Sequence, residues 1–215
     1  MKLHIYDHCP QCVIARMIFG LKGIPVTLNI LPHDDVDTPT AMIGKKMLPV
    51  LEKEDGSFMP QSMDIVHWIE RLDGQPIVTQ RHNAQLQTWL SDHRCLIDSL
   101  VLPRVVSLAF GEFESESAQQ YFIASKQHII GDFSEHLQQT DHYLEQLNQA
   151  LLQLEPMILS ERAVNGDLSE DDFHLFAMLR ELSSVKDVVY PAKVDAYRRK
   201  LASLSDVPLN DEQAI

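Results

Sequence analysis

The sequence predicts two parts of different fold class: an α/β part over residues 1–72 and an all-helical part over residues 84–215. Three observations predict this division. Strand-like and helix-like segments alternate up to residue 72, whereas nearly every segment after residue 84 has helical spacing. The stretch between them, DGQPIVTQRHN (73–83), is a polar linker that contains Gly and Pro. The charge also changes there, since residues 1–72 carry only −2 of the net −13.

The first half of the α/β part reads as strand, helix, strand. LHIY (3–6) is a short buried strand. The apolar residues that follow recur at helical spacing and end near Gly23, which is a typical helix stop. VTLNIL (26–31) contains β-branched and apolar residues and predicts a second strand.

The second half completes the order β-α-β-α-β-β-α. TPTAMIG (38–44) predicts a short helix or turn. LPVLEKEDGSFM (48–59) predicts a hairpin, because the Asp-Gly dipeptide inside it is a strong turn signal between apolar runs. SMDIVHWIERL (62–72) has the spacing of an amphipathic helix.

In the all-helical part we expect helices at 84–98, 117–155, 169–183 and 191–202, with a break near Pro103. Ser169-Glu170-Asp171-Asp172 forms an S-x-x-D pattern ahead of an apolar run. This pattern is a capping signal, and we assign it a structural role.

Composition and charge exclude several classes of protein. With 215 residues and 45% hydrophobic content, the chain is globular. A net charge of −13 without a basic run argues against nucleic-acid binding. We also expect no membrane span and no signal peptide, because no long apolar stretch occurs. Three cysteines are too few for a disulfide framework, so we expect a cytoplasmic protein. We also expect it to act as a monomer.

The strongest chemical signal is CPQC, residues 9–12, placed between the first strand and the first helix. A thiolate at Cys9 would face the N-terminus of the helix, which lowers the pKa of a thiol below its usual ~8.5. Cys12 lies one turn further and should keep a more normal pKa. This asymmetry suits thiol–disulfide exchange, in which one sulfur attacks and the other resolves the mixed disulfide.

A metal site is the weaker interpretation of the same motif. Structural zinc takes four ligands, usually from two such pairs. Here there is one pair, and Cys95 lies far away in the helical part, where we expect it to pack in the core. His8 is poorly placed to share an ion with Cys9. We therefore expect no metal.

Leu48-Pro49-Val50 places a proline where a strand should begin. Two readings stay open on the local sequence. The proline can simply mark the strand start, because it cannot donate a ladder hydrogen bond. Alternatively, a cis bond would bend the chain and expose the backbone groups of Leu48 to a bound peptide.

These segments together resemble the glutaredoxin/glutathione-transferase branch of the thioredoxin superfamily. The residues that carry the resemblance are KLHIYDHCP, CPQC with its apolar helix, LPVL, PQSMDIVHWI and VNGDLSEDD. Chain length and motif order match the two-domain bacterial glutaredoxins over the whole chain. The resemblance implies a thioredoxin-like N-terminal domain, an all-α glutathione-transferase-like C-terminal domain, and glutathione as co-substrate.

The resemblance also implies roles for individual residues. Cys9 would be the nucleophile and Cys12 the resolving thiol. Leu48, before a cis Pro49, would pair its backbone with the cysteinyl part of glutathione. Gln61 and Ser62 would hold its γ-glutamyl end, and a hydroxyl at a helix N-terminus is a suitable carboxylate site. The alternative for Ser62 is that it only caps the helix.

One residue departs from the family pattern. The familiar glutaredoxin motif has Tyr where this chain has Gln11. The thiol chemistry does not depend on that side chain, so a difference is expected in the affinity for glutathione or protein substrates. Arg16 and His8 are candidates for tuning the thiolate, although a solvated Arg and an exposed His are the simpler expectations.

The expected function is a glutathione-dependent thiol–disulfide oxidoreductase that reduces protein–glutathione mixed disulfides and protein disulfides. Its partners would be glutathione and glutathionylated or disulfide-containing proteins. Two alternatives remain. One is a cysteine-type glutathione transferase, which would have no need of Cys12. The other is a non-catalytic interaction protein with the transferase fold, which would have no use for a paired CxxC.

Overall fold

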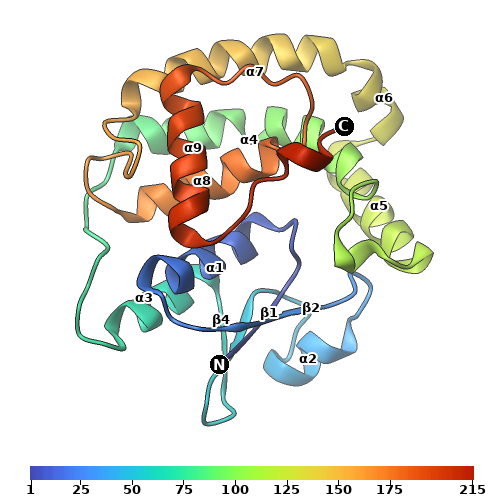
Figure 1. The fold of residues 1–215 in the computed structure, drawn as a ribbon. Coiled ribbons are helices and arrows are strands. Elements are labelled where there is room, and N and C mark those ends of the chain that lie inside the picture. Colours follow the sequence, from blue (N-terminus) through green and yellow to red (C-terminus); the bar gives the residue numbers. More distant parts are fainter.

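The computed structural model describes residues 1–215 and has the predicted fold class, an α/β part followed by an all-helical part (Figure 1). A four-stranded sheet has the order β2-β1-β3-β4. β1 pairs in parallel with β2 and antiparallel with β3, and β3 pairs antiparallel with β4. The strands are β1 (Lys2–Ile5), β2 (Thr27–Ile30), β3 (Val50–Glu52) and β4 (Phe58–Pro60).

Three helices belong to the α/β part: α1 (Pro10–Lys22), α2 (Asp37–Ile43) and α3 (Ser62–Arg71). α1 has Pro10 in its first turn, where a missing N–H costs nothing, and ends at Gly23 in the left-handed conformation. α1 packs against α3 within the α/β part and against α8 and α9 of the helical part. The helix that follows the CPQC motif is therefore enclosed from both sides.

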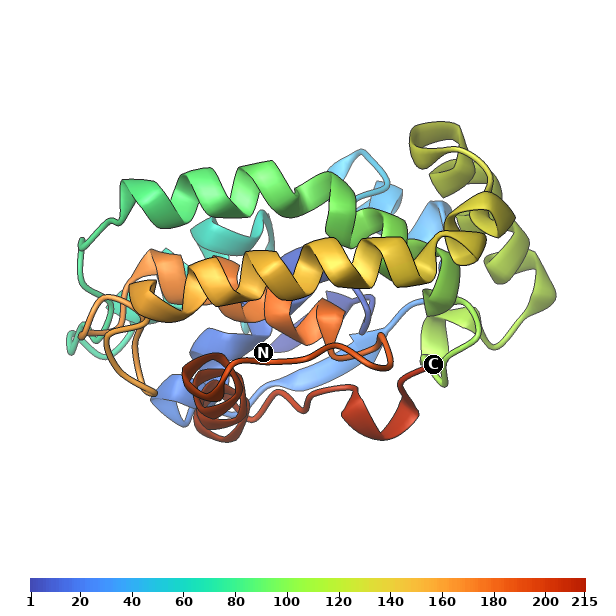
Figure 2. The same cartoon turned by 90° about the horizontal axis from the view of Figure 1, so that it is seen from above.

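The helical part begins at Ala84, after the segment that follows α3. α4 and α7 run side by side in the view from above (Figure 2), in agreement with their packing contacts. α8 is the most buried helix, with every residue from Asp171 to Leu182 buried except His174. The α-helices are α4 (Ala84–Val105), α5 (Glu116–Ile130), α6 (Phe133–Gln138), α7 (Thr140–Leu154), α8 (Glu170–Leu182) and α9 (Ala192–Ser205). The 3₁₀ helices are η1 (Gly111–Phe113), η2 (Glu155–Met157) and η3 (Asp211–Gln213).

Two helix predictions were wrong. α4 continues through Pro103 to Val105, because burial of Val101, Pro103 and Val105 in the core offsets the one backbone hydrogen bond that the proline removes. The predicted helix 117–155 is three helices. Gly131 adopts a positive φ of 94°, and the Asp132 side chain then accepts from Ser134 N–H and Glu135 N–H to start α6.

The capping prediction at the start of α8 is confirmed. Ser169 and Asp172 form a reciprocal capping box. The Asp172 carboxylate also accepts from the backbone N–H of Val164 (2.6 Å) and from the Tyr197 hydroxyl (2.9 Å). The box therefore ties α8 and α9 to the preceding loop.

The domain limits at 72/73 and 83/84 stay a prediction.

One continuous hydrophobic core of 47 buried residues includes side chains from both the sheet and the helical part. The two parts also meet through backbone. A Cβ atom at Gly20 of α1 would lie 1.8 Å from the carbonyl oxygen of Ser205, at the end of α9. Only glycine allows this approach. None of the helices combines the length and the apolar character needed to cross a membrane.

Candidate active site

Cys9 occupies the N-cap position of α1, at the junction of the first strand and the first helix. Its N–H donates to the carbonyl of Tyr6 (3.3 Å), and its own carbonyl accepts from Val13 N–H (3.0 Å). These two bonds hold the turn that carries the thiol. The residue is half-buried at the start of the helix, where its thiol faces the N–H groups of the first turn.

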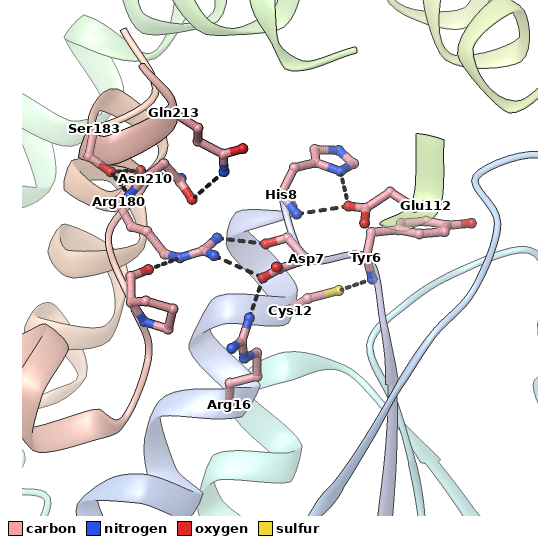
Figure 3. Close-up of polar contacts among 11 residues, drawn as sticks. Tyr6, Asp7, His8, Cys12, Arg16, Glu112, Arg180, Ser183, Asn210 and Gln213 are labelled. Atoms are coloured by element: carbon pink, nitrogen blue, oxygen red, sulfur yellow. Dashed lines mark hydrogen bonds and ion pairs between the residues drawn. The ribbon is translucent and has the colours of Figure 1, made fainter. Parts of the chain in front are cut away.

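Cys12 lies one turn further along α1 and is completely buried. Its sulfur accepts the backbone N–H of Tyr6 at 3.4 Å, a contact drawn in Figure 3. Both cysteines are free thiols. The structure thus places one half-buried and one fully buried cysteine within a single helical turn.

The two thiols differ strongly in acidity. Hydrogen bonding from the Cys12 thiol, a positive charge at His8 and the N–H groups of Cys12 and Gln11 lower the pKa of Cys9 to about 6, against the opposing effect of burial. Burial, together with the hydrogen bond to Cys9, raises the pKa of Cys12 well above its ordinary value. The sequence predicts the low pKa of Cys9 but a near-normal one for Cys12. The pKa of Cys12 is higher than the sequence predicts because Cys12 has no access to solvent.

His8 is not exposed, in contrast to the simpler sequence expectation. Its side chain is 10% exposed, and its ring Nδ1 lies 2.7 Å from Oε1 of Glu112. The backbone N–H of His8 donates to the same oxygen at 2.8 Å. Glu112 belongs to η1 of the helical part, so the residue before the reactive cysteine is held by the other part of the molecule (Figure 3).

Arg16 is not a solvated residue either. Its side chain is 10% exposed and pairs with the Asp7 carboxylate. The same carboxylate accepts from Arg180 of α8 at 2.8 Å, and Arg180 also donates to the Asp7 carbonyl at 2.6 Å. Figure 3 shows Arg180 and Arg16 reaching Asp7 from two different directions. Arg16 therefore acts on the Asp7–His8 turn through the Asp7 carboxylate.

Sequence reasoning missed Glu112, Arg180 and Asp7. Glu112 contacts His8 and Arg180 contacts Asp7, across 104 and 173 positions of sequence, and no local pattern predicts such contacts. Arg180 carried one usable signal: it directly follows the apolar run LFAML (175–179), which predicts a buried helix, and in the structure it is only 1% exposed. A charge in a buried helix requires a partner.

The residues expected to bind glutathione lie at two places, directly before β3 and at the start of α3. The Leu48–Pro49 bond is cis, and both residues are buried directly before β3, whose Val50 pairs with His4 of β1. Gln61 holds the N-cap position of α3 with a positive φ of 72°, which is uncommon for a residue other than glycine.

Ser62 does not cap α3, so the alternative role suggested for it is wrong. It is the first residue of the helix, and its hydroxyl donates to Oε1 of Gln11 at 2.7 Å. This bond brings the N-terminus of α3 to the residue between the two cysteines. The bond uses the Gln11 amide, the feature in which the motif departs from the familiar Tyr.

Cys95 is exposed, contrary to the prediction that it packs in the core. It lines a cleft of about 530 Å³ that Pro10 and Gln11 border on one side and α4 and α8 on the other. Arg94 in this cleft is engaged by Glu181. The cleft leaves open space next to the CPQC motif, between the two parts of the chain.

Comparison with known proteins adds family matches over both parts. A family model described as the C-terminal domain of glutaredoxin 2 matches residues 85–214. A model described as the N-terminal domain of glutathione S-transferase matches residues 3–77. Glutaredoxin 2 of Escherichia coli (strain K12) is 43% identical over 215 residues, which is 100% of this chain and 100% of that protein.

Solved structures agree in fold. Glutaredoxin 2 from Salmonella typhimurium in complex with glutathione is 46% identical with a TM-score of 0.98, covering 100% of this chain and 98% of that chain. A glutathione transferase from Phanerochaete chrysosporium has a TM-score of 0.75 at 15% identity, covering 97% of this chain and 98% of its own. The second likeness concerns the fold alone.

Proposed function

The chain belongs to the glutaredoxin 2 family, and from this premise we propose which residues carry out its reaction. It is a glutathione-dependent thiol–disulfide oxidoreductase, with a thioredoxin-like N-terminal domain and a glutathione-transferase-like helical domain. Cys9 is the proposed nucleophile and Cys12 the proposed resolving thiol. The observation that carries this assignment is the half-buried Cys9 at the helix N-cap, with a pKa lowered to about 6, above a fully buried Cys12.

With a protein–glutathione mixed disulfide, Cys9 alone suffices. The Cys9 thiolate attacks the glutathionyl sulfur, the old S–S bond breaks, and the protein leaves as a thiolate that takes a proton from solvent. Cys9 is then linked to glutathione. A second glutathione thiolate attacks the glutathionyl sulfur of this adduct, which releases oxidised glutathione and restores the Cys9 thiolate. The low pKa of Cys9 serves both steps, because it makes this sulfur a ready attacker and a good leaving group.

With a protein disulfide, Cys12 is needed as well. Cys9 attacks one sulfur and forms a mixed disulfide with the protein, whose other sulfur leaves. Cys12 then loses its proton, attacks Cys9 and expels the second protein thiolate, leaving a Cys9–Cys12 disulfide. Two molecules of glutathione reduce this bond in turn. Burial keeps Cys12 protonated until Cys9 is in a mixed disulfide, so the resolving thiol does not compete for the substrate.

We propose that glutathione binds along Leu48, Pro49, Gln61 and Ser62. Two features support this placement. The first turn of α3 offers unpaired N–H groups for a carboxylate, and Ser62 ties that turn to Gln11 in the motif. Gln61 is held in a strained backbone conformation, and such conformations concentrate at ligand sites. Leu48 precedes β3 and would present its backbone to the cysteinyl part of the ligand.

His8 and Arg16 are proposed to tune the thiols in different ways. His8 does so through charge, because it is the residue next to Cys9 and its positive charge favours the thiolate. Arg16 does so through position, because its pairing with Asp7 fixes the turn on which His8 and Cys9 stand. Neither needs to contact the substrate.

The partners and compartment follow from the same reaction. We propose that the substrates are glutathionylated and disulfide-containing proteins, whose reacting segment enters the cleft beside Pro10 and Gln11. A reductase driven by glutathione works where that pool is reducing, which favours the cytoplasm. We propose that the chain acts as a monomer. Light scattering on the eluting protein measures its mass, and a mass of two chains would contradict this.

The function is tested by following oxidised glutathione during reduction of a small glutathione mixed disulfide, beside conjugation of glutathione to an electrophilic aryl halide. We expect rapid reduction and weak conjugation. Cys95→Ser is the control and should match the unchanged protein, since Cys95 is an exposed residue outside the CPQC pair. Strong conjugation without reduction would indicate a transferase instead.

A further inference from the structure

Glu112 is the feature that the reaction described so far does not explain. It lies in η1 of the helical domain, and one of its oxygens, Oε1, binds both the backbone N–H and the ring Nδ1 of His8, at 2.8 and 2.7 Å. The backbone carbonyl of Glu112 accepts from His33 N–H at 2.9 Å. The residue therefore fixes two segments of the N-terminal domain at once, and one of them carries Cys9.

The carboxylate of Glu112 is buried at a considerable cost. Glu112 is 0% exposed, and its second oxygen, Oε2, has no hydrogen-bond partner. The His8 ring that it binds is surrounded by the rings of Phe110, Phe113 and Phe122, with centroids 6.2, 5.0 and 5.3 Å away. A buried charge in such surroundings is usually no better for stability than an apolar side chain of the same size. A role other than folding is the natural reason for a carboxylate here.

The charges of the pair act on the two thiols in opposite senses. The positive charge of His8 lowers the pKa of Cys9, and the negative charge of Glu112 raises the pKa of Cys12. Together they widen the difference on which the order of attack and resolution depends. His8 alone would give only the first of these effects.

We propose that Glu112 of the helical domain is a positioning residue for the dithiol: it holds His8, with its positive charge, beside Cys9, so that the second domain sets the reactivity of the first. This inference rests on the proposed roles of Cys9 and Cys12. It assigns the helical domain a part in the chemistry beyond completing the fold. The contact itself does not depend on glutathione.

Other ionisable groups near the pair do not replace Glu112. Burial holds the pKa of His33 down at about 3 and raises that of Tyr6, so both stay uncharged at neutral pH. The Asp7 carboxylate is already paired with two arginines. The titratable or charged residues around the pair are Tyr6, Asp7, Arg16, His33, Lys46, Lys126 and Arg180.

The experiment compares Glu112→Gln with the unchanged protein. Gln keeps the shape and an oxygen acceptor but removes the charge. The rate of alkylation at Cys9 is measured against pH by mass spectrometry of the peptide that contains it, in the reduced protein without glutathione. The matched control is Glu170→Gln. Glu170 also pairs with a histidine of the N-terminal domain, His67, at 2.7 Å, but on the surface and outside the thiol site.

We expect the midpoint of the Cys9 profile to rise by about one pH unit in Glu112→Gln and to stay in place in Glu170→Gln. At pH 7 the equilibrium between the Cys9–Cys12 disulfide and glutathione should shift about fivefold toward the disulfide, because the reduced form loses thiolate stabilisation. His8→Gln should raise the midpoint equally, and adding Glu112→Gln to it should raise it no further. That non-additivity marks a residue that acts through His8.

An unchanged or lowered Cys9 midpoint in folded Glu112→Gln would overturn the inference. It would leave the proposed function intact, because turnover of mixed disulfides by the unchanged protein is measured separately. Circular dichroism establishes that each variant folds. If Glu112→Gln does not fold, nitrogen NMR of the His8 ring in the unchanged protein decides the matter. Protons on both ring nitrogens at pH 7, where Cys9 is a thiolate, support the inference, and a neutral ring with a single proton there refutes it.

Discussion

The Ser62 hydroxyl donates a 2.7 Å hydrogen bond to Oε1 of Gln11, which joins the first turn of α3 to the residue between Cys9 and Cys12. The proposed glutathione site and the reactive thiol are thereby connected through a side chain that differs from the familiar motif. The contact makes Ser62 a better probe of glutathione binding than a simple helix cap would be, since its loss removes no capping bond.

Replacing Ser62 by Ala should raise the Michaelis constant for glutathione about fivefold, because one hydrogen bond contributes on the order of 1 kcal/mol. The alkylation profile of Cys9 should stay unchanged. Steady-state kinetics with varied glutathione measure the first quantity. Ser57→Ala, in the exposed turn between β3 and β4, is the control. Unchanged glutathione kinetics in Ser62→Ala would remove Ser62 from the proposed site.

The two cysteines should respond differently to substitution. Cys9→Ser should abolish reduction of both mixed disulfides and protein disulfides, because the attacking sulfur is gone. Cys12→Ser should retain mixed-disulfide turnover and lose most reduction of protein disulfides. Parallel assays on a glutathionylated peptide and on a disulfide-bonded protein measure the two activities. Loss of mixed-disulfide turnover in Cys12→Ser would show that the roles are assigned wrongly.

The reactivity of Cys9 should depend on pH with a midpoint near 6. Because the pKa is lowered, the thiolate forms as the pH rises through this value. The alkylation rate should therefore climb over about one pH unit on either side of the midpoint and then level off. An ordinary thiol with a pKa of ~8.5 still gains rate above pH 8. The same peptide alkylated in denaturant supplies that comparison. Identical profiles in the folded and unfolded protein would refute the effect of the fold.

Removing the Arg180 guanidinium should destabilise the protein strongly. Arg180 is 1% exposed and bonds to the carbonyls of Pro208 and Asp7 and to the Asp7 carboxylate. Arg180→Met leaves the carbonyls of Pro208 and Asp7 without a donor, while the Asp7 carboxylate keeps only Arg16, and the loss of several hydrogen bonds from a buried charged group costs about 3–5 kcal/mol. Denaturant unfolding measures the loss. Arg199→Met, which removes an exposed arginine paired with Asp195, should cost less than about 1 kcal/mol.

Features set by neighbouring residues were predictable from the sequence. The start of α1 at Pro10, the β3–β4 hairpin and the capping box of Ser169 and Asp172 all depend on side chains within a few positions of one another. For Leu48-Pro49 the sequence left two interpretations, a plain strand start or a cis peptide bond, and the bond is cis. Such signals depend only on nearby residues, so they can be recognised without knowledge of the tertiary structure.

Features set by packing were not predictable in the same way. From the sequence, His8 and Arg16 were expected at the surface. The partner of His8, Glu112, comes from the other domain, and the partner of Arg16, Asp7, lies in a turn whose shape the sequence does not predict. Cys95 reads as a core residue because its apolar neighbours suggest burial, yet it faces the cleft. The turn at Gly131 requires a positive φ that a single glycine in a helical pattern only hints at.

The approach of Gly20 to the Ser205 carbonyl has a consequence for how the chain is made. α1 rests on α8 and α9, and one core serves both domains, so the helix that carries CPQC is fully supported only when α9 is in place. During synthesis the motif leaves the ribosome first but must wait for nearly the whole chain before it is held in its working geometry. In the finished protein the same dependence should make thermal unfolding a single transition, and a protease cut in the 73–83 segment should leave two fragments that remain bound to each other.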